Sequence, residues 1–196
     1  PEMDSLLFYL PLAGSAFKKV YYDNLLGRAT SRLVKAEDLV VAYETTDLET
    51  SPRFTHVMSM TGNDLKKLQL AGSYRQTEIG ETADLDYNEA KEKIDELQGI
   101  AKPITDYDEY TVLELHVDLE LEDDDNYGFA VPYVVTILED KSEILSIRRN
   151  WNENDELFRK KEYFVHYKFL PGLGFYGFGL IHMIGGLTKS ATSILR

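Results

Sequence analysis

Residues 163–196 read YFVHYKFLPGLGFYGFGLIHMIGGLTKSATSILR, and this stretch decides the architecture that we expect for the chain. Its first part, Tyr163–Phe169, is expected to form a strand, and Pro171 and Gly172 then fix a turn. From Leu180 onward, apolar residues recur every three or four positions, which places them on one stripe of a helix. The order is strand, glycine-rich turn and helix. Such an order brings backbone close to a phosphate, a neighbouring subunit or a partner helix.

The tail is rich in glycine, and its glycines are candidates for close subunit packing or for a hinge. They are Gly172, Gly174, Gly177, Gly179, Gly185 and Gly186. No glycine, asparagine or proline follows the last periodic residue, so the helix has no stop signal. We therefore expect the helix to continue past Arg196, and the chain, which begins at Pro1, to be a piece of a longer protein.

Composition and charge limit the classes of function. A length of 196 residues with 43% hydrophobic and 12% aromatic residues is typical of a globular chain with a substantial core. The net charge of -13 argues against tight, sequence-independent binding of nucleic acid, which needs a basic surface. The sequence contains no cysteine, so disulfides, thiolate metal sites and cysteine nucleophiles are excluded for it.

The first part of the chain, residues 1–105, is expected to mix helices and strands. A helix is expected at Ser5–Phe17, interrupted or bent at Pro11 and closed near Gly14. A second helix begins at the cap residue Thr61, with Asp64 three residues later, and ends at Gly72. The remaining expected elements are strands at Lys18–Asp23, Arg28–Val34, Leu39–Ala42 and Phe54–Met60, and a solvated helix at Tyr87–Leu97.

The second part, residues 106–196, is expected to be an antiparallel meander followed by the tail helix. Val112–Leu121 alternates strictly between apolar and charged residues, which predicts one buried face and one solvated face that carries Glu114, His116, Asp118 and Glu120. Three more strands are expected at Val131–Leu138, Ile144–Ile147 and Tyr163–Phe169. The fold class is therefore α+β, a four-stranded meander with packed helices and a C-terminal helix.

The segment Gly172–Gly177 matches the G-x-G-x-x-G pattern of dinucleotide-binding turns. Such a site needs an apolar parallel strand before the glycines and an acidic residue about 20 positions after them. Here the preceding strand carries His166 and Lys168, and no acidic residue follows Glu162. The pattern therefore favours glycines that allow close packing over glycines that hold a phosphate, and no cofactor is expected.

No metal site or hydrolase signature emerges from the spacing. The four histidines, His56, His116, His166 and His182, are far apart, so we interpret them as core or sheet residues. The acidic run Asp123–Asp125 lacks the pattern of a calcium loop and is read as a solvated loop. No serine lies in a G-x-S-x-G elbow, and the chain is expected not to be an enzyme.

Basic residues are concentrated between two of the expected strands. Arg148 and Arg149 lie beside Trp151, and Arg159, Lys160 and Lys161 follow. These residues and Lys189 are candidates for contact with DNA or a protein partner. A charged end of a hairpin explains the same cluster.

Several segments together resemble the portal proteins of tailed bacteriophages and prophages, particularly those of short-tailed phages. The segments are DSLLFYLPLAGSAFKKVYYD, VKAEDLVVAYETTDLETSPRFTHVMSMTGNDLKKLQ, SEILSIRRNW and the tail quoted above, so the resemblance covers about Met3 to Arg196. These motifs are specific in their order along the chain and in their residues, but they carry no catalytic signature.

The resemblance implies a structural role. A portal is a ring of identical subunits, usually twelve, at one capsid vertex of the virion, and it assembles in the host cytoplasm. It binds terminase, capsid protein and tail or head-completion proteins, and double-stranded DNA passes through it. This chain would come mostly from the wing, with Gly177–Arg196 leading toward the stem.

The acidic charge agrees with such a conduit, because an acidic ring lets DNA slide. Glu114, Asp118 and Glu120 are candidates for the acids that face DNA. Two other functions remain open. One is a nucleotide-binding enzyme that uses Gly172–Gly177, and the other is a membrane-associated module that inserts Phe169–Leu187, although the resemblance implies no membrane partner.

Overall fold

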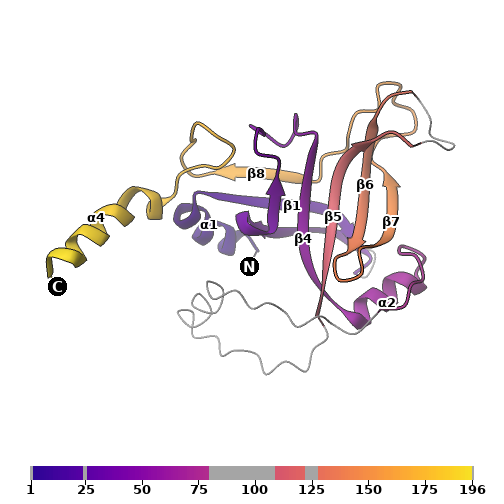
Figure 1. Cartoon of the computed structure of the whole chain (residues 1–196), viewed down its shortest axis with the longest axis horizontal. Helices are drawn as coiled ribbons and strands as arrows, with labels where there is room; N and C mark the ends of the chain where they lie inside the picture. Colours follow the sequence, from indigo (N-terminus) through magenta and orange to yellow (C-terminus); the bar gives the residue numbers. More distant parts are fainter. Residues whose placement is uncertain (1, 24–25, 80–108, 122–127, 196) are drawn as a thin grey trace.

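The computed structural model describes residues 2–23, 26–79, 109–121 and 128–195 (Figure 1). These residues form two antiparallel sheets with helices beside them and a helix at the C-terminal end. The predicted α+β class is confirmed. The predicted helix Tyr87–Leu97 and the acidic run Asp123–Asp125 lie outside the described residues.

The larger sheet is an antiparallel meander of five strands in the order β3-β4-β5-β6-β7. Its strands are β3 (Leu39–Val41), β4 (Arg53–Thr61), β5 (Glu109–Leu119), β6 (Val131–Leu138) and β7 (Glu143–Arg149). The strands predicted at Leu39–Ala42, Phe54–Met60, Val112–Leu121, Val131–Leu138 and Ile144–Ile147 therefore match β3 to β7 within a few residues at each end.

The smaller sheet has the order β2-β1-β8, with β1 (Ser15–Asp23), β2 (Arg28–Lys35) and β8 (Phe164–Lys168). The strands predicted at Lys18–Asp23 and Arg28–Val34 are confirmed, and they pair antiparallel as a hairpin. The prediction that Tyr163–Phe169 is the fourth strand of the meander is wrong, because β8 pairs antiparallel with β1 instead. Phe164 is buried in a cluster with Phe17 and Phe54, and this contact brings β8 to the smaller sheet. Each sheet thus contains strands from both of the expected parts, 1–105 and 106–196.

Helix α1 (Glu2–Ala13) begins and ends earlier than predicted. Ser15–Phe17, expected in the helix, opens β1, and all three residues are buried. Gly14 ends the helix with φ 88, a left-handed conformation that glycine adopts without strain.

Helix α2 (Gly62–Leu70) begins and ends as the sequence predicted. The Thr61 hydroxyl accepts a hydrogen bond from the Asp64 amide at 3.2 Å, and Gly72 follows the helix with φ 72. A 3-10 turn at Ala36–Asp38 precedes β3, and the last element is α4 (Leu180–Leu195).

The core lies in three apolar clusters. One joins the two sheets around Phe17, Phe54 and Phe164, and a second lies between α2 and the larger sheet around Leu65 and Val112. The third covers the opposite face of the larger sheet, where Trp151 packs on β6. Both faces of β5 are therefore covered over part of its length.

This arrangement overturns part of the solvated face predicted for β5. Glu114 is 7% exposed and His116 5% exposed, whereas Asp118 and Glu120 are exposed as predicted. The alternation located the strand correctly. The smaller sheet nevertheless covers Glu114 and His116, and burial of the Glu114 carboxylate is possible because Lys19 of that sheet pairs with it.

Candidate functional site

The glycine-rich turn packs against the turn that follows α1. A Cβ atom on Gly179 would collide with the Leu12 carbonyl oxygen and lie 2.5 Å from the Gly14 nitrogen. A Cβ atom on Gly177 would lie 2.6 Å from the Gly14 carbonyl oxygen. Only glycine allows so close an approach of two backbones, so these two glycines join the start of α4 to the end of α1.

The other glycines of the tail differ from these two. Gly172 lies close to Tyr176 and Phe178 of its own loop. Gly174, Gly185 and Gly186 have open space where a Cβ atom would lie. The close packing predicted for the tail glycines is thus found within the chain at Gly172, Gly177 and Gly179. Their role in subunit packing stays a prediction.

Three backbone amides at the end of this turn, those of residues 177 to 179, already have acceptors within the protein. The Gly177 amide donates to the Ser15 hydroxyl at 2.8 Å, and the Phe178 amide donates to the Leu170 carbonyl at 2.8 Å. The Gly179 amide donates to His182 Nδ1 at 3.1 Å. A phosphate-binding turn needs such amides to point at the ligand. This geometry and the antiparallel pairing of β8 both depart from a dinucleotide site.

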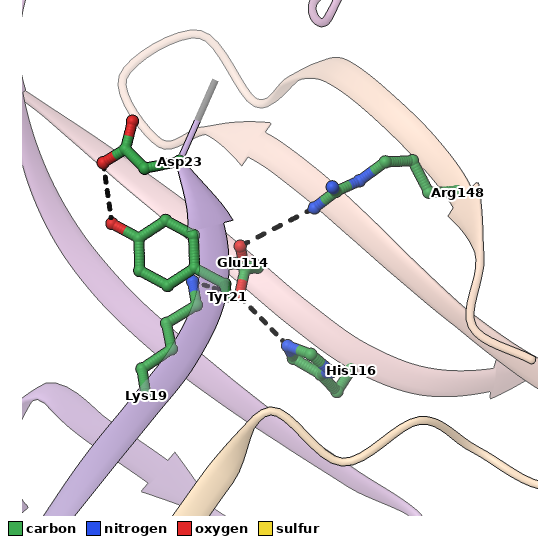
Figure 2. A network of polar contacts seen from close by, with 6 residues as sticks. All are labelled: Lys19, Tyr21, Asp23, Glu114, His116 and Arg148. Carbon is green, nitrogen blue, oxygen red and sulfur yellow. Dashed lines mark hydrogen bonds and ion pairs between the residues drawn. The ribbon is translucent and has the colours of Figure 1, made fainter. Parts of the chain in front are cut away.

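A buried polar network lies where the two sheets meet (Figure 2). Lys19 reaches from β1 and donates to Glu114 of β5 at 2.7 Å, with side chains 8% and 9% exposed. His116 Nε2 lies 3.0 Å from the same carboxylate oxygen. Arg148 of β7 approaches the other oxygen at 3.8 Å, but its side chain is 59% exposed. Three strands therefore converge on one carboxylate.

A second acid extends the network along β1. Asp23 accepts a hydrogen bond from the Tyr21 hydroxyl at 3.3 Å and pairs with Arg32 of β2 at 3.4 Å. Lys19 also lies 4.9 Å from the centroid of the Tyr21 ring. Figure 2 shows Tyr21 between Asp23 and the Glu114 carboxylate, so the two acids belong to one polar region.

Aromatic rings enclose one side of the network. The His116 ring stacks on Phe54 with centroids 4.5 Å apart, and Phe164 meets His116 edge-on at 5.5 Å. Phe164 also meets His56 edge-on at 5.4 Å. These rings exclude water and lower the local dielectric constant, which strengthens each charge interaction inside.

The environment shifts the pKa values of the three residues at the centre of the network. Burial lowers the pKa of Lys19, although the nearby Glu114 charge opposes the shift. Burial alone would raise the pKa of Glu114, but the hydrogen bond from His116 and the charge of Lys19 outweigh it, so that pKa lies well below its usual range. Burial also lowers the pKa of His116. The lowered pKa values of Glu114 and His116 leave a carboxylate and an uncharged imidazole at neutral pH, and the Lys19 Nζ atom lies 2.7 Å from that carboxylate.

A row of polar side chains crosses the sheet at Glu114. The register places His56 opposite Glu114, Glu114 opposite Thr136 and Thr136 opposite Ser146. His56 Nδ1, Thr136 Oγ1 and Ser146 Oγ are buried and make no hydrogen bond with protein atoms. Burial and the charge of Lys19 lower the pKa of His56 to about 4. The row separates the two apolar clusters on this face of the sheet.

The basic residues predicted to form one cluster are spread over different contacts. Lys160 donates to the carbonyls of Leu48 and Ser51 at 2.6 and 3.2 Å and so holds the loop before β4. Arg149 lies 6.0 Å from the Trp151 ring. Arg148 approaches Glu114 as described above, and Arg159 and Lys161 are exposed. Lys189, a separate candidate on α4, is also exposed.

The histidines divide between the core and the surface. His56 and His116 are buried, and His166 stacks on Phe17 and accepts or donates a bond at 3.2 Å to the Ser15 hydroxyl. His182 is exposed on α4, so the reading as a core or sheet residue fails there. Among the described residues, no group of three or more His, Asp or Glu side chains is arranged to hold a metal ion.

Helix α4 has no buried residue along its described length. Every described residue of the helix is exposed, including Ile181, Ile184 and Leu187. Figure 1 shows that α4 runs away from both sheets and meets α1 only near its own beginning. A groove of about 850 Å³ lies there. Its lining residues are Leu12, Leu180, Ile181, Ile184, Gly185, Thr188, Lys189, Thr192 and Ser193.

No family model matches the sequence, and no curated protein matches it.

The polar network was not predicted from the sequence, because Lys19 and Glu114 are 95 positions apart. The signal that could have pointed to it is the short polar row on β5, where His116 follows Glu114 on the same face of a strand.

Proposed function

We propose that this chain is a structural subunit of the portal ring of a short-tailed phage. Twelve copies surround a channel for double-stranded DNA during packaging and ejection. The ring docks terminase and the tail or head-completion proteins, and capsid protein surrounds it at one vertex of the virion. Assembly takes place in the host cytoplasm.

One observation carries the proposal beyond the sequence resemblance: an antiparallel sheet leads through a glycine-packed turn into an uncovered helix. Gly177 and Gly179 fix the start of α4 against α1, and the rest of α4 projects from the body (Figure 1). A fixed base and an exposed apolar helix suit a subunit that completes its packing in an assembly.

Of the three acidic residues predicted to face DNA, two remain candidates. Glu114 is paired with Lys19 inside the protein, so it does not contribute to a channel surface. Asp118 and Glu120 are exposed near the end of β5. Together with the net charge of -13, they suit a surface along which DNA slides without being held.

A packaging assay tests the function. Empty capsids assembled with this protein are expected to package DNA in the presence of terminase and ATP, and capsids assembled without it are expected to package none. The variant Asp118→Lys/Glu120→Lys should slow DNA entry, because it creates cations that bind phosphate. Glu153→Lys is the control, because it makes the same kind of charge reversal on an exposed loop that is distant in sequence from Asp118 and Glu120. Equal packaging with and without the protein would refute the proposal.

Two rival functions have their own tests. A nucleotide-binding enzyme predicts a thermal shift with dinucleotides or nucleoside triphosphates, whereas the occupied amides of Gly177 and Gly179 predict none. A membrane-associated module predicts flotation with liposomes. None of the helices within the described residues is long and apolar enough to cross a membrane.

A further inference from the structure

The two oxygens of the buried Glu114 carboxylate have unequal partners. Oε1 accepts a hydrogen bond from Lys19 Nζ at 2.7 Å and lies 3.0 Å from His116 Nε2. Oε2 faces Arg148, whose Nη2 atom is 3.8 Å away, too far for a direct hydrogen bond (Figure 2). Polar contacts of this length are often bridged by water. Among the described residues, Oε2 therefore has a nearby cation but no direct hydrogen-bond donor.

Two hydroxyl groups beside Glu114 are buried and unpaired within the described part of the chain. Thr136 of β6 lies opposite Glu114, and Ser146 of β7 lies opposite Thr136. Thr136 is 0% exposed, and neither its Oγ1 atom nor the buried Ser146 Oγ atom makes a hydrogen bond with protein atoms. Buried polar groups in native proteins are usually paired, either with protein or with ordered water. The two hydroxyls and Oε2 therefore call for a small polar partner.

The register of the strands brings these three groups within reach of one water molecule. Residues directly opposite each other in antiparallel strands have Cβ atoms about 4.5–5.5 Å apart. A water with two hydrogen bonds of ordinary length spans about 4–5 Å between its partners. A molecule over Thr136 can therefore reach Glu114 on one side and Ser146 on the other. His56 lies beyond Glu114, two strand spacings or about 9–10 Å from Thr136, and is outside this reach.

The surroundings of these groups are enclosed on two sides and open toward solvent at one end. Lys19 covers Glu114 from the smaller sheet. Tyr74 packs against the apolar cluster beside α2, and burial followed by the charge of Glu114 raises the pKa of Tyr74 to about 12. At β7, the edge strand of the larger sheet, Ser146 is only half-buried and the Arg148 side chain is 59% exposed. Water can thus enter from this edge without any opening of the fold.

We propose that Glu114, Thr136 and Ser146 form an internal hydration site that binds an ordered water molecule. The water donates a hydrogen bond to Glu114 Oε2 and accepts one from each hydroxyl, which matches the donors and acceptors that these groups offer. Three hydrogen bonds are typical of a buried water. The site completes the solvation of the carboxylate that Lys19 pairs with, and it links β5, β6 and β7 through their side chains. It lies in the body of the protein and is independent of the portal function.

Magnetisation transfer from water in NMR spectra provides a direct test. The Thr136 methyl group is expected to receive Overhauser transfer of opposite sign in laboratory-frame and rotating-frame spectra, the signature of a long-lived contact. Thr45 is the control for transfer relayed through a hydroxyl proton, because its buried hydroxyl is already paired with Ser51 at 3.1 Å. Transfer at Thr136 should exceed that at Thr45. Equal transfer at the two methyl groups, or none at Thr136, would overturn the proposal.

A substitution measures what the bound water contributes to stability. Thr136→Val keeps the shape of the side chain and removes the hydroxyl, so it should raise the equilibrium constant for unfolding about fivefold, the effect of one lost hydrogen bond. Thr55→Val is the control, because Thr55 is half-buried on the opposite face of β4, and it should change the constant little. Urea unfolding of both variants supplies the comparison.

The two measurements together leave four outcomes. Water transfer at the Thr136 methyl group with a raised unfolding constant in Thr136→Val supports the hydration site. A lowered constant without transfer would show a dry, unpaired hydroxyl, because removing such a group stabilises a protein. A raised constant without transfer would assign the hydroxyl a protein partner. Transfer with an unchanged or lowered constant would show a water that Thr136 does not hold. Each of the last three results refutes the site.

Discussion

Removing the charge of Lys19 should destabilise the fold more than any surface change. The Nζ and Oε1 atoms of the pair lie 2.7 Å apart, and both side chains are less than one-tenth exposed. At an effective dielectric constant of about 20, their attraction is about 6 kcal/mol before the desolvation of both ions is subtracted. In Lys19→Met the Glu114 carboxylate stays buried, and the cation that the described residues still offer it is Arg148, at 3.8 Å with its side chain 59% exposed. The expected loss of unfolding free energy is about 3–5 kcal/mol.

Urea unfolding measures this loss through the fluorescence of Trp151, the only tryptophan and a buried one. At a typical slope of about 2 kcal/mol per molar urea, the midpoint should fall by about 2 M. Lys35→Met is the matched control, because Lys35 pairs with Glu37 at 3.5 Å with both side chains about half exposed. That variant should lose less than about 1 kcal/mol.

The double variant Lys19→Met/Glu114→Leu separates the pair from the packing around it. Replacing both ions with apolar groups removes the unpaired charge, so the double variant should lose less stability than the two single variants added together. If Lys19→Met costs no more than Lys35→Met, or if the single losses simply add, the buried pair does not hold the sheets as we argue.

Three further predictions concern the turn, the titration of the core and a helix cap. Gly179→Ala should destabilise the protein and loosen α4, because the added Cβ atom would collide with the Leu12 carbonyl oxygen. Gly186→Ala is the control: its Cβ atom would enter open space, so the substitution should stabilise α4 by up to about 1 kcal/mol. Thermal unfolding and the helical signal of circular dichroism measure both effects. The pKa of His56 is about 4 in the fold against an ordinary 6.5, so the unfolded state binds more protons in this window and the unfolding free energy should fall as pH drops through it. His56→Phe should flatten that dependence in urea titrations at pH 4 to 6.5, and an unchanged slope would contradict the assignment. Thr61→Ala removes the hydroxyl that accepts from the Asp64 amide and should cost about 1 kcal/mol, with Thr46→Ala, on an exposed loop, as a control that changes little.

Much of the fold was predictable because its signals are local. Alternation located β5, and Thr61 with Gly72 marked the ends of α2, since a cap and a stop residue act within one turn. The tail was read correctly as strand, turn and helix. The end of α1 was misplaced, because nothing local showed that Ser15–Phe17 would be buried by pairing with β8.

By itself, the sequence determined which segments alternate, where α2 starts and stops, and that no cysteine chemistry is available. Only the tertiary structure decided which face of β5 is buried and which sheet receives β8. The physical reason is that alternation along a strand assigns residues to its two faces but does not determine which other elements cover each face. A buried Glu114 is stable only when a cation joins it, and that cation comes from Lys19, 95 positions away.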